Sequence, residues 1–479
     1  MEKFYITTPI YYVNDKPHIG SAYTTIAGDV LARFHRARGA DTFLLAGVAE
    51  HGSKISESAE KAGKDVQAFV DEMSAKFSLA WDSLNIVPDD FIRTTEPRHV
   101  NAVNLFFEKL KQSGKIYEGE YEGLYCVGHE AFIKESELVN GLCPDHHTKP
   151  ELVKEKNWFF KLSEYGDILT KKITSGEFVI LPEERRNEIL SFIKQGLEDI
   201  TISRQSAKFA LPLPWDPSQT IYVWLDELFN YCSAIGYGAD EEKFKRYWPA
   251  DVQLMGKDII KFHCIIWPAL LMAIGEEIPK KIFAHGFFTV GGQKMSKTVG
   301  NVIDPVAWAD KYGADAVRYF LLREVPFGQD GDVSEEKLKA RYEGDLANGL
   351  GNLVSRITTL IEKHLDGQYG RHSKLIWYAP FKQQKKIDQL ITGFHFHEAL
   401  GEIWERVAAA NKTVDEEKLW ELAKTDKEKF AQACHYLVLE LSSIADWLAP
   451  FMPETAKKIS DIIMADKITK AEPLFPRIE

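Results

Sequence analysis

The sequence predicts an α/β fold, in which a parallel-sheet domain carries an insertion and is followed by an all-helical region. Three observations support this prediction. An aromatic and β-branched run at residues 3–13 is followed by helical apolar spacing at 20–38 and by a second apolar run at 42–49. The strand-to-helix pattern recurs at 252–273. Beyond about residue 345 the apolar spacing is helical almost throughout.

Length and composition exclude several classes of protein. The chain has 479 residues, enough for about three domains with sizeable cores. Hydrophobic residues make up 45% and charged residues 27%, and no repeat period is present, which excludes disordered, collagen-like and solenoid proteins. The 59 basic and 71 acidic residues give a formal net charge of -12, which excludes a uniformly basic surface that binds any polyanion. A local basic patch remains compatible with this balance.

The cysteines and the hydropathy pattern indicate the cellular compartment of the protein. Five cysteines, an odd number scattered over a long chain, do not resemble a secreted disulfide framework. The N-terminus lacks the basic and apolar regions of a signal peptide, and no stretch approaches about 20 consecutive apolar residues. We therefore expect a cytoplasmic protein that does not associate with a membrane.

The first 50 residues form one predicted βαβ unit. The strand at 3–13 ends at Asn14 and Asp15, with Pro17 close behind, and the helix at 20–38 stops at Gly39. The run at 42–49 supplies the second strand. A βαβ unit implies a parallel sheet with its ligand at the carboxyl ends of the strands, so chemistry is expected at the turn 14–21.

Further elements follow in order. Closely spaced Cys, His and Gly between about 115 and 215 interrupt the pattern, and strand-like runs resume at 220–225, 252–256 and 281–290. Candidate helices then lie near 346–363, 380–411, 415–423, 426–447 and 453–463. We predict five regions: the first half of a Rossmann-type domain at 1–115; a connective insertion at 116–216; the second half of that domain at 217–290; a loop region at 291–345; and a helical bundle at 346–479.

Two motifs carry candidate chemistry. His18, Gly20 and Ser21 lie at the predicted start of a helix, where unpaired N–H groups and the helix dipole favour phosphate. The second motif places Lys294 and Lys297 in a Gly-flanked polar loop after a strand, where two ammonium groups can stabilise a phosphoryl or nucleotidyl transition state. Taken singly, the first motif also fits a simple helix cap, and the second fits a solvated basic loop.

Together, HIGS at 18–21 and KMSKT at 294–298 resemble the signature pair of class I aminoacyl-tRNA synthetases. TPIYYVND at 8–15, YVWLDELFNYCSAIGY at 222–237 and GKDIIKFHCIIWPALLMA at 256–273 resemble the methionyl-tRNA synthetase branch. The resemblance implies ATP-dependent ligation of L-methionine to tRNA through methionyl-adenylate, without a covalent enzyme intermediate. ATP is expected with Mg²⁺.

The resemblance also implies roles for individual residues. His18, Gly20, Gly256, Asp258 and Lys297 are expected at ATP, and His18, Ser21, Lys294 and Lys297 are expected to act in adenylate formation. A methionine pocket would comprise Ile10, Tyr12, Trp224, Glu227, Tyr231, Ile259, His263, Ile266 and Trp267, with Arg204 near the substrate carboxylate. An aromatic box of this kind suits a thioether. Composition alone also fits plain core packing for each aromatic residue.

One departure from the family pattern concerns the substrate ammonium. The family places an aspartate where this chain has Ala49, and alanine where it has Glu227. A buried ammonium without a partner costs several kcal/mol, so we expect Glu227 to replace the missing carboxylate. The alternative is that Glu227 faces solvent and that amino-acid specificity has changed. Two milder departures are Ser21, where the family has histidine, and Thr298, where it has serine.

The insertion contains a candidate metal site. Cys126 and His129 form one short pair, Cys143 and His146 form another, and 13 residues separate the pairs. Two such pairs on two turns match the needs of tetrahedral Zn²⁺, and a closed site with four protein ligands would be structural. The alternative is a metal-free knuckle with His147 at the surface.

The helical region is expected to bind tRNA. The resemblance implies that Asn352, Arg356 and Trp420 read a CAU anticodon. A four-residue spacing puts Asn352 and Arg356 on one helix face, and Trp420 could stack an unpaired base. Leu419 stands where the family has proline. The protein is expected to act as a monomer or with a separate tRNA-binding subunit.

Two other functions remain open from the sequence. One is a related nucleotidyltransferase that does not use tRNA, against which the KMSKT loop and the helical region argue. The other is a non-catalytic RNA-binding paralogue, which Ala49 and Ser21 make conceivable. Retention of His18 and of both lysines favours catalysis.

Overall fold

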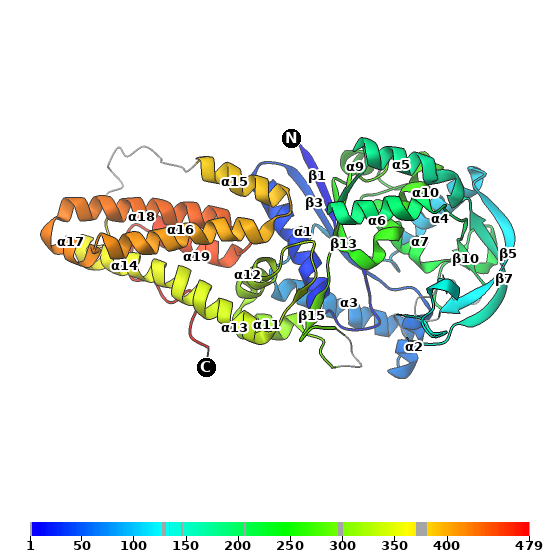
Figure 1. The fold of residues 1–479 in the computed structure, drawn as a ribbon, viewed down its shortest axis with the longest axis horizontal. Coiled ribbons are helices and arrows are strands. Elements are labelled where there is room, and N and C mark those ends of the chain that lie inside the picture. Colours follow the sequence, from blue (N-terminus) through cyan, green and yellow to red (C-terminus); the bar gives the residue numbers. More distant parts are fainter. Residues whose placement is uncertain are drawn as a thin grey trace.

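The computed structural model describes residues 2–126, 131–133, 135–144, 147–205, 207–295, 300–369 and 381–478. An α/β body and an elongated helical bundle lie end to end, with the bundle formed by the last third of the chain (Figure 1). Both the parallel sheet and the helical region that the sequence predicts are thereby confirmed. None of the described helices combines the length and apolar composition needed to cross a membrane.

Within the described residues, seven strands form the main sheet in the order β2-β3-β1-β13-β14-β8, with β4 also paired to β3. The pairings are parallel throughout. The strands are β1 (Lys3–Thr7), β2 (Tyr11–Tyr12), β3 (Asp41–Ala49), β4 (Asp90–Arg93), β8 (Val179–Leu181), β13 (Val252–Gly256) and β14 (Lys281–His285). Helix α1 (Ile19–Ala37) crosses from β1 to β3, as the βαβ prediction requires.

Buried side chains alternate between the two faces of the sheet along each strand, so each face has its own hydrophobic core. Tyr5 packs on one face and Ile6 on the other, and Leu45 and Leu44 repeat the pattern, because successive strand residues point to opposite faces. One face is covered by α1, α2 (Ser53–Lys61) and α3 (Val66–Ser83), and the other by α4 (Pro97–Gln112), α8 (Asn230–Ser233), α9 (Glu241–Tyr247) and α10 (Trp267–Ala273).

The segment 116–216 contains mainly antiparallel strands. In its described part, β6-β5-β7-β9 form one sheet and β10-β12-β11 another. These strands are β5 (Ile116–Cys126), β6 (Ala131–Ile133), β7 (Glu151–Phe160), β9 (Ile200–Thr201), β10 (Ser203–Arg204), β11 (Pro212–Leu213) and β12 (Asp216–Ile221). Between them lie α5 (Gly166–Ser175), β8 and α6 (Glu183–Lys194). Strand β8 joins the main sheet beside β14, although it lies within the segment predicted as an insertion.

Four expected elements differ from the observed ones. The strand expected at 3–13 is divided into β1 and β2, with residues 8–10 between them outside any strand. The run at 220–225 is not a strand throughout, because α7 (Val223–Leu228) begins there. The run at 281–290 divides at Gly286 into β14 and β15 (Phe288–Val290), where a Cβ atom would lie 2.3 Å from the Gln329 backbone. The expected helix at 380–411 is two helices, α15 (Phe381–Thr392) and α16 (Phe396–Glu416), and Phe394 between them stacks on Phe283 of the sheet domain.

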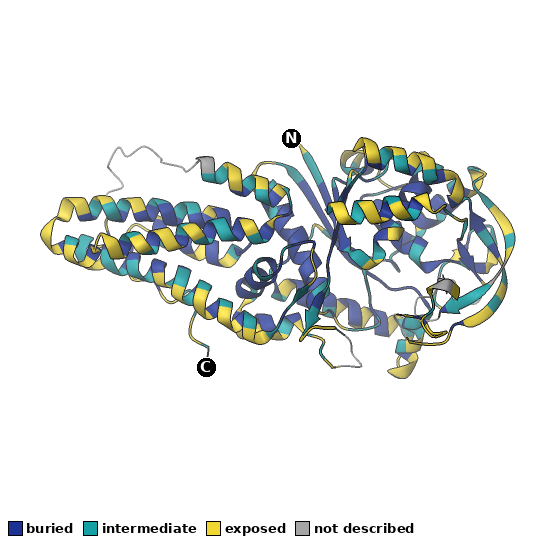
Figure 2. Cartoon of the chain, in the orientation of Figure 1, coloured by how far each residue is buried: buried dark blue, intermediate teal, exposed yellow. Residues whose placement is uncertain are grey.

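A second group of elements connects the sheet to the bundle. Strand β15 pairs with β16 (Gln293–Lys294) and β17 (Gly331–Asp332), beside α11 (Pro305–Tyr312) and α12 (Ala314–Glu324). Helix α13 (Glu335–Arg341) continues through a π-helix at Tyr342–Gly351 into α14 (Asn352–Leu365). The bundle is completed by α17 (Leu419–Thr425), α18 (Lys427–Leu448) and α19 (Pro453–Met464). Buried side chains continue from the α1 face of the sheet into the bundle (Figure 2).

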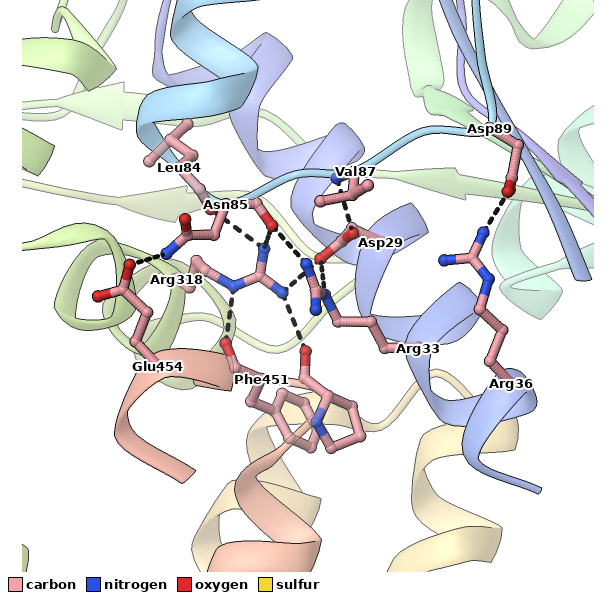
Figure 3. Close-up of polar contacts among 11 residues, drawn as sticks. Asp29, Arg33, Arg36, Leu84, Asn85, Val87, Asp89, Arg318, Phe451 and Glu454 are labelled. Carbon is pink, nitrogen blue, oxygen red and sulfur yellow. Dashed lines mark hydrogen bonds and ion pairs between the residues drawn. The ribbon is translucent and has the colours of Figure 1, made fainter. Parts of the chain in front are cut away.

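A buried ion pair fastens this junction. Arg318 on α12 and Asp29 on α1 are both fully buried, and their side chains approach to 2.7 Å. Arg318 also donates to the carbonyl oxygens of Phe451 (2.8 Å) and Pro450 (2.9 Å) at the turn between α18 and α19 (Figure 3). The helix that begins with HIGS is therefore bonded, through one side chain, to the bundle.

Candidate active site

A cavity of about 430 Å³ opens at the carboxyl ends of β1, β13 and β14, where the sequence predicts chemistry. The HIGS helix, the segment after β13 and helix α7 all contribute to its wall. The lining includes Ile10, Tyr12, Asp15, His18, Gly20, Ser21, Trp224, Glu227, Gly256, Asp258, Ile259, His285 and Met295. Segments more than 200 residues apart in sequence are thus brought to one place.

His18 is the N-cap of α1. Its Nδ1 atom accepts the backbone N–H of Gly20 at 3.1 Å. Ser21 completes a capping box, because its Oγ atom donates to the His18 carbonyl at 2.7 Å and accepts the His18 N–H at 3.1 Å. Acceptance at Nδ1 leaves the ring proton of a neutral His18 on Nε2, as a donor at the positive end of the helix dipole. The cap and the candidate phosphate site are therefore the same feature.

The segment around KMSKT adjoins this helix start. The N–H of Ile19 donates to the carbonyl of Ile303 at 3.0 Å, and the Met295 side chain lies 3.6 Å from where a Cβ would sit on Gly20. Lys294 belongs to β16, and its side chain, like Lys297 and Thr298, lies outside the described residues. The described part of this motif is consequently next to His18.

Aromatic rings form the other end of the cavity. Trp224 stacks on Phe262, with ring centroids 4.5 Å apart, and meets Tyr12 edge to face. Ile10, Ile259 and Glu227 line the wall beside them. Phe262 was missed by the sequence reasoning, although its position within the GKDIIKF stretch could have indicated it.

Other predicted pocket residues do not line the cavity. Tyr231, His263 and Trp267 are buried, and Tyr231 Oη lies 2.7 Å from His263 Nε2. His263 Nδ1 donates to the Ile259 carbonyl, and burial lowers the pKa of His263 to about 4, so its ring is neutral and accepts the Tyr231 hydroxyl. Ile266 lies on the same helical stretch and is half-buried. Through His263, Tyr231 is linked to the backbone of Ile259, which lines the cavity.

Arg204 lies outside the cavity lining. Its guanidinium stacks over the ring of Tyr222 at 3.9 Å and donates to Thr201 Oγ1 and the Ser203 carbonyl, each at 2.7 Å. The structure therefore does not bring Arg204 together with the residues that line the cavity.

Two carboxylates near the aromatic end are held by protein groups. Asp226 accepts His51 at 2.7 Å and His99 at 2.9 Å. Burial alone would raise the pKa of Asp226, but the two histidines hold it well below its usual range. Glu50 is fully buried and accepts Arg93 Nε at 2.7 Å, together with the hydroxyls of Ser74 and Thr95. Ala49, at the end of β3, is buried opposite Tyr12 and contributes no charge.

His285 is a further residue that sequence reasoning missed. It lines the cavity, and its Nε2 atom lies 2.5 Å from Thr24 Oγ1, in the second turn of α1. Burial lowers the pKa of His285 to about 4, so the neutral ring accepts the threonine hydroxyl while Nδ1 donates to the Gly286 carbonyl. A lone histidine within an apolar strand carries no motif that could have indicated this contact.

The metal prediction rests only partly on described residues. Cys126 and Cys143 are both buried, and the Cys143 carbonyl accepts the His147 N–H at 2.8 Å in a tight loop. His129 and His146 lie outside the described residues. In the part of the chain that the structure describes, no group of three His, Cys, Asp or Glu side chains could hold a metal.

The predicted RNA-reading residues lie together in the bundle. Asn352 is exposed at the start of α14, and Arg356, one turn later, forms an ion pair with Asp415 of α16. Trp420 is 43% exposed on α17, which packs against α14. An exposed indole beside polar side chains is suited to stacking a nucleobase.

Comparison with known proteins agrees with this geometry. The family model described as tRNA synthetases class I (M) matches residues 4–150 and 146–358. The methionine–tRNA ligase of Caldanaerobacter subterraneus subsp. tengcongensis is 45% identical, over 99% of this chain and 79% of that protein. That of Thermotoga maritima is 44% identical, over 95% of this chain and 74% of that protein.

A solved structure shares the whole fold. Mycobacterium tuberculosis methionyl-tRNA synthetase in complex with methionyl-adenylate superposes with a TM-score of 0.94, at 38% identity and over all of both chains. The parallel sheet, its HIGS helix and the KMSKT motif of the sequence define a class I aminoacyl-tRNA synthetase. Within that class, the chain belongs to the methionine–tRNA ligase family. The family prediction made from the motifs is confirmed.

Proposed function

We propose that this protein activates L-methionine with ATP and transfers the methionyl group to tRNA. A single observation carries the proposal: HIGS, the GKD segment after β13 and the aromatic wall of α7 converge on one cavity. Family membership and the 38% identical structure with bound methionyl-adenylate support the same reaction. ATP enters as its magnesium complex, so the metal belongs to the substrate.

In the first step, a methionine carboxylate oxygen attacks the α-phosphorus of ATP, the bond to the β-phosphate oxygen breaks, and pyrophosphate leaves. His18 Nε2–H would donate to a phosphate oxygen, and the positive end of the α1 dipole would stabilise the phosphate charge. Asp258 would accept the ribose hydroxyls, and Lys294 and Lys297 would neutralise the charge that develops on the leaving group. In the second step, a hydroxyl of the terminal tRNA adenosine attacks the methionyl carbonyl and AMP leaves.

The methionine side chain would lie among Ile10, Tyr12, Trp224 and Ile259, where aromatic edges suit its sulfur. Its ammonium needs an anion. Neither Asp226 nor Glu50 lines the cavity, whereas Glu227 lines it beside Trp224 and is only 6% exposed. Glu227 is therefore the carboxylate assigned to the methionine ammonium.

ATP–pyrophosphate exchange with each of the twenty amino acids tests this function. Exchange with methionine alone is expected. Exchange with another amino acid would refute the assigned specificity, and no exchange would favour a non-catalytic RNA-binding paralogue.

Variants at position 227 test the ammonium site. Glu227→Gln should raise the methionine KM roughly 100-fold, because the substrate charge then lacks its partner, while the ATP KM stays within about twofold. The double variant Ala49→Asp, Glu227→Ala offers a matched comparison, since Ala49 lies opposite Tyr12 at the same edge of the sheet. Recovery of methionine affinity in the double variant is expected. An unchanged KM in Glu227→Gln would refute the role of Glu227.

In the bundle, Asn352, Arg356 and Trp420 would read a CAU anticodon. The exposed indole and the shared helix face support this assignment. Aminoacylation of tRNA transcripts with altered anticodons tests it. Altered anticodons are expected to lower the kcat/KM of aminoacylation and to leave ATP–pyrophosphate exchange unchanged.

Cys126, His129, Cys143 and His146 would hold a structural zinc ion that orders the insertion. Two buried cysteines, one of them in a tight loop, provide thiolates of the type that Zn²⁺ prefers. The protein would be cytoplasmic, and gel filtration distinguishes a monomer from a complex with a separate tRNA-binding subunit.

A further inference from the structure

Two carboxylates, Asp330 and Asp332, lie at the end of the connection from α12 to β17, a segment that carries no recognised motif. Neither is among the described residues that line the cavity. Each nevertheless bonds to a segment that contributes to the proposed ATP site, Asp330 to the GKD segment and Asp332 to the hairpin of β15 and β16. Both contacts therefore bear on how ATP is held.

Close packing fixes this connection in place. The Phe327 ring is 8% exposed, and its centroid lies 5.1 Å from that of Tyr23 on α1 and 5.6 Å from that of His285 in the cavity wall. It also meets Phe396 of α16 edge to face, with centroids 5.0 Å apart. The backbone two residues later packs on Gly286 so closely that no Cβ atom would fit. The two carboxylates are thus attached to a segment held by the HIGS helix, the sheet and the bundle.

Asp330 holds the GKD segment beside the end of β14. Its Oδ1 atom accepts Lys257 Nζ at 2.8 Å and the Phe287 N–H at 2.7 Å. Lys257 directly precedes Asp258, and both Asp258 and Phe287 line the cavity. The Asp330 side chain is 54% exposed, and ion pairs at such positions contribute little to the stability of a fold. The geometry of this pair therefore points to the placement of Asp258 rather than to stability.

Asp332 holds the hairpin that carries Lys294. Gly291 and Gly292 form its turn, both with positive φ (61° and 75°). Asp332 Oδ1 accepts the Gly292 N–H at 2.7 Å and the Thr289 hydroxyl at 2.9 Å. Thr289 is the residue that pairs with Lys294 across the two strands. One carboxylate oxygen thus bonds both the turn before Lys294 and the strand opposite it, which fixes the backbone from which this lysine extends.

We propose that Asp330 and Asp332 are positioning residues for adenylate formation, with separate effects on binding and on rate. The inference rests on the proposed activation of methionine. Asp258 would contact the ribose equally in bound ATP and in the transition state, so loss of Asp330 should weaken ATP binding. Charge develops on the leaving pyrophosphate only in the transition state, so loss of Asp332, which orients Lys294, should lower the rate.

Steady-state ATP–pyrophosphate exchange by the full chain with methionine tests both roles. Asp330→Ala should raise the ATP KM about 5- to 10-fold and leave kcat within about twofold. Asp332→Ala should lower kcat about 10-fold and leave the ATP KM within about twofold. Asp332→Asn keeps an acceptor oxygen for Gly292 and Thr289, so its kcat should stay close to that of the wild type. Asp461→Asn is the control, because Asp461 is an exposed aspartate that pairs with Lys457 on α19 and should affect neither constant.

The outcomes separate this inference from the proposed function. If the wild type exchanges with methionine and both alanine variants match Asp461→Asn, the positioning roles are refuted and the function stands. The roles are likewise refuted if both alanine variants change kcat and KM alike, as a purely structural defect would. An Asp332→Asn variant as slow as Asp332→Ala refutes the hydrogen-bonding role of Asp332. No exchange by the wild type refutes the function and the positioning roles together.

Discussion

Replacing Asp29 by asparagine should destabilise the junction between the catalytic domain and the bundle. The Asp29 carboxylate lies 2.7 Å from both Arg318 and Arg33, and it accepts the Val87 N–H at 3.1 Å (Figure 3). Arg318 is fully buried, and its remaining described partners are backbone carbonyls. Among the described residues, Asp29→Asn therefore removes the only carboxylate that forms an ion pair with the buried Arg318 guanidinium.

The cost can be estimated by comparison with a second ion pair at the same junction. Removing one partner of a buried pair costs about 3–5 kcal/mol, because the other charge stays desolvated. The pair between Arg38 and Asp388 is 44% and 29% exposed, and pairs of this kind contribute only about 0–1 kcal/mol. Asp29→Asn should thus cost at least about three times as much as Asp388→Asn.

Thermal unfolding measures this difference. At roughly 2–4 °C per kcal/mol, Asp29→Asn should lower Tm by about 6–12 °C or more, and Asp388→Asn by less than about 4 °C. The double variant Asp29→Asn, Arg318→Met removes both charges and should be more stable than Asp29→Asn alone, because no uncompensated charge remains. Equal shifts for the two single variants, or a double variant less stable than Asp29→Asn, would refute the reasoning.

Three further results are expected. Zinc analysis should find about one ion per chain, and Cys126→Ser should remove it; a metal-free wild-type protein would contradict the zinc site. Burial lowers the pKa of His35 and His263 to about 4, so between pH 6.5 and pH 4 the folded state binds fewer protons than the unfolded chain. The contribution of these histidines to stability should therefore be complete above pH 6.5 and decrease toward pH 4. Tm should depend less on pH in His263→Gln, and a pH dependence identical to that of the wild type would contradict this. Trp420→Ala should lower aminoacylation kcat/KM about 10- to 100-fold through lost base stacking, and equal losses in ATP–pyrophosphate exchange would contradict an RNA-specific role.

The elements that could be predicted from the sequence are those whose hydrophobic period decides the structure locally. The βαβ unit is confirmed because its two strands are continuously apolar and its helix has a regular stripe. The run at 281–290 is also largely apolar, but its division at Gly286 depends on contact with the Gln329 backbone, which lies 43 residues later in the chain. The π-helix at Tyr342–Gly351 was not predicted, because apolar residues four apart also fit the 3.6-residue period of an ordinary α-helix.

The candidate site was predictable where its residues lie next to strand ends. His18, Asp258 and Trp224 follow or flank such ends and carry recognisable motifs, and all three line the cavity. Phe262 and His285 act through partners that only the folded chain supplies, namely Trp224 and Thr24. Contacts between distant segments leave no local pattern, so the sequence shows neither contact, although the GKDIIKF stretch marks the position of Phe262.

Asp226 and Glu227 are consecutive carboxylates on α7, and they lie in different surroundings. Successive helix residues point about 100° apart, so Asp226 and Glu227 cannot face the same surroundings. Asp226 turns inward to His51 and His99, and its charge is already balanced within the protein. Glu227 lines the cavity beside Trp224, where the proposed methionine ammonium would contact it. Because Ala49 brings no charge to this end of the cavity, the proposed partner of the ammonium comes from α7 rather than from β3.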